Sequence, residues 1–450
     1  MLGCEKRDSF GFRFLFFSES KEIRIFAKNL VMSTFSRLFW VLLPLLLPQL
    51  LFSQDKKDFG FKFYGQVRAD LFYNSRSNSE TVDGLFYMYP KDHSYDADGN
   101  DLNAKPDGSL YTMYSRLGID VTGPEIGNGI TTSAKVEVDF RGGGTNYYMI
   151  RLRQAYFNLG FGRSSLLVGQ TWHPFYGDVA PDILNLNMGA PFQPFSRAPQ
   201  VRYMYVNRNF QLKATALWQS QYLSVGPSSN QAGVTSTQKS QNFIKNSCVP
   251  ELALNLDYKG NGWIAGAGVD MTSIVPRTQS EYKGNTYKVK ERITTVSAEA
   301  HVKYSGNDWL VAAKSVLGSN FTQASGVGGY GIRSVDARTG EQEYSSVRVS
   351  STWLNVAYGK KFRPGVFVGY LKNLGASDDV SGVLGTGIGD GLDQLVSASA
   401  ELTYNLPHWK FGVEYVASTA WYGDVMRDAR IENTHSVTNH RVVFSALFQF

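Results

Sequence analysis

Apolar and polar residues alternate along many segments of this chain, with a period of two residues. Near the start of the first such segment, Phe63 and Leu71 lie on one face, whereas Arg68 lies on the other. The segments 133–140 and 296–304 repeat the pattern. Because successive side chains of a β-strand point to opposite faces, this period predicts strands with one apolar and one polar face.

The alternation, together with turn-forming residues between the segments, predicts sixteen strands in eight hairpins. The connections alternate between short turns and loops that mostly have about 15 to 35 residues, apart from a brief link around Gly142. The predicted strands are residues 62–74, 110–122, 131–141, 146–160, 164–172, 199–207, 209–221, 250–258, 262–274, 291–304, 308–320, 349–359, 364–374, 394–405, 408–419 and 438–450.

Aromatic residues beside three short turns indicate which way the apolar faces point. In a soluble sandwich the apolar face lies in the core, whereas in a membrane barrel it contacts lipid. Each of these turns has a Tyr before it and a Trp after it: Tyr258 and Trp263, Tyr304 and Trp309, Tyr404 and Trp409. Tyr and Trp at one level are typical of a membrane interface. The pattern therefore predicts an all-β fold, a transmembrane antiparallel β-barrel with short periplasmic turns and long extracellular loops.

The N-terminal region carries a pattern typical of export. Residues 38–52 are almost wholly apolar but are interrupted by two prolines, so they are too short for a membrane-spanning helix of about 20 residues. They follow Arg37 and end near Ser53, as in a secretory signal peptide. We therefore expect a mis-assigned or extended leader (1–31), a signal peptide cleaved before Gln54 (32–53) and a single barrel domain (54–450).

Composition excludes several classes of function. Seven of the 45 Lys and Arg residues and four of the 39 Asp and Glu residues precede residue 54, so the net charge falls from +6 to +3 beyond it. This balance excludes a typical nucleic-acid-binding protein. Cys248 is the only cysteine beyond residue 53, which excludes an internal disulfide and a thiolate metal site there. No cofactor and no nucleic-acid partner are expected.

The candidates for metal binding and catalysis are weak. The six histidines lack the spacing of a metal site, and we expect no metal other than a weak calcium candidate. That candidate is an oxygen-rich segment, for which a solvated acidic loop is the alternative: Asp96, Asp98, Asn100 and Asp101. Outward positions are aliphatic or aromatic, and no Ser/His pair suggests a hydrolase. We therefore expect no enzyme, and a barrel enzyme is the least favoured alternative.

Several segments resemble a family of porin-like outer-membrane proteins of Bacteroidota type and, more distantly, general 16-stranded porins. The segments that carry the resemblance are FYGQVRADLFYNSR (63–76), SRLGIDVTG (115–123), RLRQAYFNLGFG (151–162), GQTWHPFYGDVAP (169–181) and NMGAPFQPFSRAPQV (187–201). The resemblance implies the outer membrane of a Gram-negative bacterium, contact with its lipid, and a homotrimer.

A porin is the function that we expect. A TonB-dependent transporter would need an N-terminal plug and 22 strands, but the first predicted strand begins about eight residues after the cleavage site. The polar strand faces also disfavour a channel for hydrophobic solutes. The sequence thus indicates a water-filled channel for passive diffusion of small polar solutes or ions. A substrate-specific outer-membrane channel is the alternative.

The loop at residues 174–198 is predicted to fold into the lumen, because it is unusually apolar for a loop in water. The alternative is that it packs over a neighbouring subunit. Porins of the resembling type keep a constriction loop at this position. Four arginines on nearby strands are expected to face inward: Arg68, Arg116, Arg151 and Arg153. The loop offers Asp178 and Asp182 opposite them, and such a transverse field favours anions on the basic side. The alternative is that inward-facing carboxylates pair with the arginines: Asp70, Asp120, Glu137 and Asp139.

Overall fold

The structure, a computed structural model, describes residues 59–81, 86–141 and 149–450. The predicted leader and signal peptide, and the link around Gly142, lie outside these residues. Among the described residues, the helices are too short or too polar to cross a membrane.

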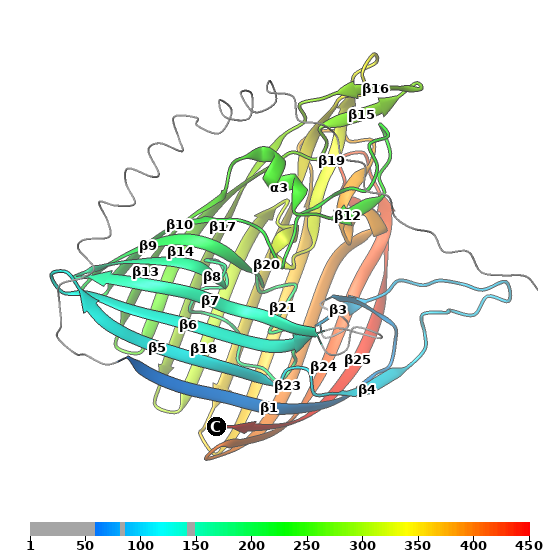
Figure 1. Cartoon of the computed structure of the whole chain (residues 1–450). Coiled ribbons are helices and arrows are strands. Elements are labelled where there is room, and N and C mark those ends of the chain that lie inside the picture. The colour runs from blue at the N-terminus through cyan, green and yellow to red at the C-terminus, as the bar shows by residue number, and fades with distance from the viewer. Residues whose placement is uncertain (1–58, 82–85, 142–148) are drawn as a thin grey trace, which may run out of the picture. The chain divides into compact units, whose positions relative to one another are not determined.

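Sixteen strands of the described residues form one closed antiparallel sheet (Figure 1). Each pairs with the next along the chain, and the first also pairs with the last, which closes the ring. The barrel strands are β1 (Gly60–Asn74), β5 (Arg116–Ile126), β6 (Ile130–Arg141), β7 (Met149–Phe161), β8 (Ser164–Trp172), β9 (Arg197–Asn207), β10 (Phe210–Leu217), β13 (Glu251–Gly260), β14 (Trp263–Ile274), β17 (Ile293–Gly306), β18 (Trp309–Ser319), β20 (Gln342–Tyr358), β21 (Phe362–Gly375), β23 (Leu392–Leu406), β24 (Trp409–Val425) and β25 (Ile431–Gln449).

Shorter elements lie in the long loops at one end of the barrel. They are β2 (Asn78–Thr81), β3 (Phe86–Pro90), β4 (Asp107–Tyr111), β11 (Val225–Pro227), β12 (Thr237–Lys239), β15 (Gln279–Tyr282), β16 (Asn285–Lys288), β19 (Gly328–Val335), β22 (Val383–Thr386), the helix α3 (Asn242–Ser247), and the 3-10 turns η3 (Thr322–Ala324) and η4 (Ile388–Asp390).

All sixteen predicted strands are confirmed, but the second is interrupted. The predicted strand 110–122 is β4 and β5 separated by residues 112–115. The Ser115 hydroxyl donates to the carbonyl of Thr112 and accepts the backbone N–H of Arg68, which replaces part of the ladder. The alternation of apolar and polar residues does not detect such an interruption. The interruption brings Tyr114 into the lumen.

The apolar strand faces point outward, as predicted. Leu71 is 52% exposed and Leu254 is 48% exposed, whereas the lumen-facing Asp70 is 2% exposed. Ser297 and Glu299 of β17 are likewise buried, whereas Val296 of the same strand is 61% exposed. A charged inner face and an apolar outer face are what a membrane barrel requires, because its outside contacts lipid.

A girdle of aromatic side chains surrounds the short-turn end. The predicted Tyr and Trp residues pack across neighbouring hairpins rather than across their own turns: Trp263 with Tyr304 (ring centroids 4.9 Å apart), Trp309 with Tyr358 (4.7 Å), Phe362 with Tyr404 (4.8 Å) and Trp409 with Phe448 (4.8 Å). The turns are tight, since Asn261 and Gly262 both have positive φ. The girdle marks one membrane interface.

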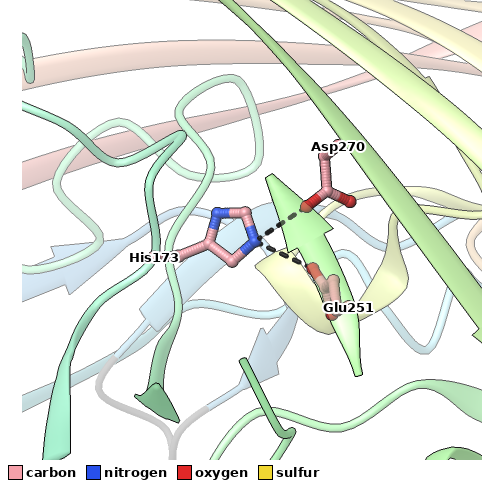
Figure 2. Close-up of side chains that lie close together, drawn as sticks. All are labelled: His173, Glu251 and Asp270. Carbon is pink, nitrogen blue, oxygen red and sulfur yellow. Dashed lines mark hydrogen bonds and ion pairs between the residues drawn. The ribbon is translucent and has the colours of Figure 1, made fainter. Parts of the chain in front are cut away.

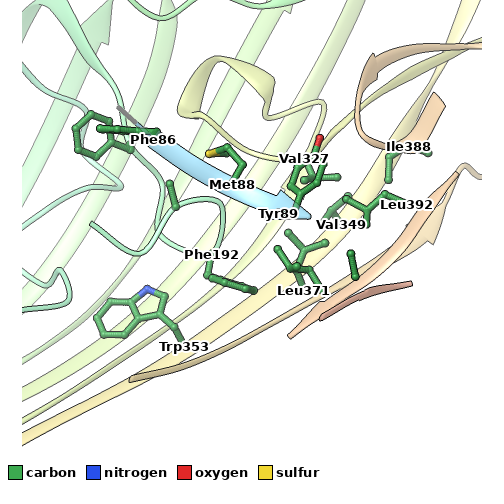
Figure 3. Close-up of a cluster of buried hydrophobic side chains, with 14 of the residues drawn as sticks. Phe86, Met88, Tyr89, Phe192, Val327, Val349, Trp353, Leu371, Ile388 and Leu392 are labelled. Carbon is green, nitrogen blue, oxygen red and sulfur yellow. The ribbon is translucent and has the colours of Figure 1, made fainter. Parts of the chain in front are cut away.

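Part of the inner wall is apolar, which corrects the expectation of a polar lumen throughout. Trp353 of β20, Phe367 and Leu371 of β21, and Leu395 of β23 are buried on the inner face. They join a hydrophobic cluster with residues of the long loops (Figure 3). Alternation does not reveal this, because apolar residues on these strands occupy the inner face as well as the outer face, as Phe367 and Val366 do on β21.

Candidate functional site

The loop between β8 and β9 folds into the lumen, as predicted. Its apolar side chains Phe175, Leu186 and Phe192 are at most 3% exposed. The loop crosses to the opposite wall, where the Leu184 N–H donates to Glu401 Oε2 (2.8 Å). The Asp182 N–H donates to Asn355 Oδ1 (2.9 Å). We call residues 173–196 the lumen loop.

Two wall glycines allow the lumen loop to approach closely. A Cβ on Gly369 would lie 2.5 Å from the ring of Phe192, and a Cβ on Gly412 would lie 2.5 Å from Leu184 Cδ1. The absence of side chains at these positions therefore creates the space that the loop occupies.

Three of the four predicted arginines meet around one aromatic ring. The guanidinium carbons of Arg68, Arg116 and Arg153 lie 5.3, 5.0 and 5.7 Å from the centroid of Tyr114. Cations over an aromatic face are attracted by its quadrupole, which offsets part of their mutual repulsion. The interrupted strand thus provides the centre of the arginine cluster, which sequence alone did not identify.

Each of the four arginines also has a carboxylate partner on the wall, as in the salt-bridge alternative. Arg68 lies 2.9 Å from Asp70, and Arg116 lies 3.7 Å from Glu137. Asp139 accepts from both Arg151 (2.6 Å) and Arg153 (2.7 Å), and Arg153 also contacts Glu137 (2.7 Å). Asp120 pairs with Lys135 instead (2.6 Å). The arginines therefore form a compensated network on β1, β5, β6 and β7.

The two loop aspartates pair with cations of other strands. Asp178 Oδ2 lies 3.0 Å from Lys213 Nζ and 2.6 Å from Lys259 Nζ. Burial alone would raise the pKa of Asp178, but these two ammonium groups lower it below its ordinary value. Asp182 pairs with Arg363 of β21 (2.6 Å). These pairs fix both ends of the central part of the lumen loop to the wall.

Arg197, which sequence reasoning missed, is buried without a carboxylate partner among the described residues. Its guanidinium lies over Trp172 (4.6 Å to the centroid) and Tyr222 (5.6 Å). Its Nε and Nη1 find no hydrogen-bond partner there. A cavity of about 120 Å³, lined by Arg151 and Tyr222 among others, lies nearby. The sixth predicted strand, 199–207, starts two residues later than β9 does, so Arg197 was assigned to the loop.

A second segment, which the sequence did not predict, also enters the barrel. The strand β3 contributes Phe86, Met88 and Tyr89, each at most 5% exposed, to the same hydrophobic cluster (Figure 3). Asn187 of the lumen loop donates to the Tyr87 carbonyl (2.8 Å). The run FYMYP in an external loop was the available signal.

A buried histidine and two carboxylates meet where the lumen loop begins. His173 Nε2 lies 2.8 Å from Glu251 Oε1 and 3.6 Å from Asp270 Oδ2 (Figure 2). Burial alone would lower the pKa of His173, but the two carboxylates raise it to about 9. The expectation of no metal site did not consider this group, because its members are distant in sequence.

The calcium candidate is engaged in local hydrogen bonds. Asp96 Oδ1 accepts the N–H groups of Asp98 (2.9 Å) and Asn100 (2.8 Å), and Asp101 contacts Arg76 (2.7 Å). Such bonds are those of an ordered turn, and calcium binding there stays a prediction.

A model of the DcaP outer membrane protein family matches residues 52–221, which is less than half of the chain. None of the curated proteins compared with the sequence matches it.

Three solved structures are similar in fold. The outer membrane channel DcaP of Acinetobacter baumannii has a TM-score of 0.61 and 18% identity, over 88% of this chain and 99% of that chain. Outer-membrane expressed OmpT of Vibrio cholerae has a TM-score of 0.51 and 13% identity, over 88% and 99%. A trimer form of in-vitro folded OmpT has a TM-score of 0.50 and 13% identity, over 88% and 100%. These similarities show the 16-stranded barrel fold.

Proposed function

We propose that this chain is an outer-membrane porin, a water-filled channel for passive diffusion of small polar solutes, constricted by the lumen loop. The supporting observation is that an apolar loop crosses the lumen beside a wall of arginines and carboxylates. Sixteen strands leave room for an aqueous channel around such a loop. The partial match to an outer-membrane family, and the channel among the similar structures, support the same function.

Single-channel recording in planar bilayers tests the constriction. Deletion of residues 182–188 removes the attachment of the loop to Glu401 and Asn355, so conductance should rise. The control is a deletion of the same length, residues 280–286, in the β15–β16 hairpin outside the barrel sheet. Unchanged conductance in the first variant, with a folded barrel, would contradict the proposed constriction.

The charged wall should determine ion selectivity, with anions preferred on the arginine side. Replacing Arg151 and Arg153 by Ala leaves Asp139 and Glu137 without their main cationic partners. The reversal potential in a salt gradient should therefore shift toward cations. Arg333→Ala is the control, because Arg333 pairs with Glu343 on an exposed loop strand. If the double variant shows no shift, the arginines are structural only.

A substrate-specific channel is the second candidate, and Arg197 is the observation that favours it. A buried cation with no carboxylate partner among the described residues, stacked on aromatic rings, is suited to contact an anionic solute. Saturable conductance with rising solute concentration would favour this candidate, whereas a linear dependence would favour the general porin.

Assembly and source are also proposals. We infer a homotrimer in outer-membrane lipid from the resemblance to porins and from the trimer form among the similar structures. Cross-linking in native membranes should give a trimer band, and monomer alone would exclude it. The Bacteroidota type rests on the sequence resemblance alone.

A further inference from the structure

We propose that His173, Glu251 and Asp270 bind a divalent transition-metal ion such as Zn²⁺. The bound ion would hold the start of the lumen loop against the barrel wall. The three residues come from three different elements. His173 is the first residue of the lumen loop, Glu251 begins β13, and Asp270 lies in β14 (Figure 2).

The geometry fits a small cation with nitrogen and oxygen ligands. Around zinc, ligand atoms about 2.0–2.2 Å from the ion in a tetrahedral set lie roughly 3.3–3.6 Å from one another. His173 Nε2 is 2.8 Å from Glu251 Oε1 and 3.6 Å from Asp270 Oδ2. One ligand atom from each residue lies within 4.8 Å of the other two. Small side-chain rotations therefore suffice to place an ion between them.

The charge of the group is not balanced by protein cations. Neither Glu251 nor Asp270 forms an ion pair with a Lys or Arg in the described part of the chain. With His173 protonated and both carboxylates ionised, one negative charge remains in a site where all three residues are at most 1% exposed. Such a buried charge is costly unless it is paired, coordinates a metal or is neutralised by a proton. A divalent ion that displaces the histidine proton supplies the missing positive charge.

Two oxygens at the site lack hydrogen-bond partners among the described residues. Asp270 Oδ2 faces His173 but accepts no hydrogen bond, and Gln323 Oε1 is also unpartnered. Gln323 is 1% exposed, and its amide Nε2 lies 3.0 Å from Glu251 Oε1. Rotation of the amide by 180° would present Oε1 to the same site, which offers a fourth ligand for a tetrahedral set.

A second buried histidine shows what a compensated group looks like. His301 lies 2.9 Å from Glu299 and 3.2 Å from Asp257, but Asp257 also pairs with Lys213 (2.8 Å). Lys213 forms an ion pair with the Asp257 carboxylate and so supplies the balancing positive charge. His301 is therefore a matched control, being buried, on the inner wall and next to two carboxylates.

Metal binding is tested on the full-length barrel, independently of channel activity. The protein is denatured in urea with EDTA, freed of chelator and refolded in detergent with Co²⁺ or Zn²⁺, so that the ion can enter before the loop closes. We expect about one ion per chain, and visible d–d bands for Co²⁺. His173→Gln and Asp270→Asn should abolish this binding, whereas His301→Gln should keep it. Heat-modifiable migration in SDS gels verifies that each variant is folded.

X-ray absorption of the wild-type Zn²⁺ form provides a measurement that needs no variant. We expect one imidazole nitrogen and otherwise oxygen neighbours. Binding well below one ion per chain, a shell with several imidazoles or sulfur, or equal binding by folded Asp270→Asn would each overturn the proposal. These assays do not measure conductance. The metal site can therefore be confirmed or refuted independently of the proposed porin function.

Discussion

Removal of one aromatic ring should release the lumen loop from the wall. Phe192 is 2% exposed, and its ring packs over Gly369 and lies 6.1 Å from the ring of Phe367. Phe192→Ala deletes this contact and leaves a cavity on the wall. Truncating a buried Phe typically costs about 3–5 kcal/mol. The ring is buried only while the loop is docked. The substitution therefore destabilises the docked state relative to the detached state by this whole amount.

The size of the effect follows from this cost. Since about 1.4 kcal/mol is a factor of ten in an equilibrium constant, the detached population should rise roughly 10²- to 4 × 10³-fold. Proteolysis follows this population when the loop opens and closes faster than it is cut. Chymotrypsin should therefore cut after Leu184 and Leu186, both 3% exposed in the docked loop, faster by a similar factor.

The assay is a time course of digestion in detergent, with fragments identified by mass spectrometry. Phe444→Ala is the control, because Phe444 is 54% exposed on the outer face of β25 and lies on the lipid side. An unchanged cutting rate at Leu184 and Leu186 in Phe192→Ala, with the barrel intact, would refute the view that packing on β21 holds the loop.

Three further predictions concern the barrel and its export. Leu254→Arg on the lipid face of β13 should destabilise the barrel by about 2–4 kcal/mol in urea titrations in lipid, whereas Phe210→Arg in the girdle should cost about 0–1 kcal/mol; equal costs would contradict the assigned membrane position. The protein should migrate anomalously in SDS gels until it is boiled, because a closed sheet has no free edge; identical mobility before and after heating would argue against the barrel. Mass spectrometry of protein from outer membranes should find a first residue near Gln54, and a start before residue 38 would exclude the signal peptide.

The barrel could be predicted from the sequence because the signals for its strands and turns are local. Alternation along each strand and aromatic residues at each short turn are readable within about ten residues, so all sixteen strands and the girdle were identified. Errors occurred where hydrogen bonds depart from the ladder, as at Ser115. The strand β20 was predicted too short because its first residues pair with the loop strand β19 rather than with a barrel strand.

The site was predicted only in part, because its contacts join residues distant in sequence. Alternation placed the four arginines and their carboxylates on the inner face, but it could not choose the partners of Asp178 and Asp182, which lie on β10, β13, β21 and β24. The group of His173, Glu251 and Asp270 has no signature in the chain, since its members are separated by 78 residues or more from His173. Only the closed barrel brings them together.

The two kinds of inner wall explain why the lumen loop lies where it does. Apolar side chains of the loop lose contact with water only against another apolar surface, and β20, β21 and β23 supply it through Trp353, Phe367 and Leu395. The wall of β1, β6 and β7 is charged, and each charge there keeps a partner such as Asp139. These ion pairs are already buried, since Arg153 and Asp139 are each 1% exposed, so their partners within the wall offset their desolvation. The apolar side chains of the loop therefore pack on β20, β21 and β23, while its Leu184 carbonyl accepts a hydrogen bond from Arg68 on the charged wall.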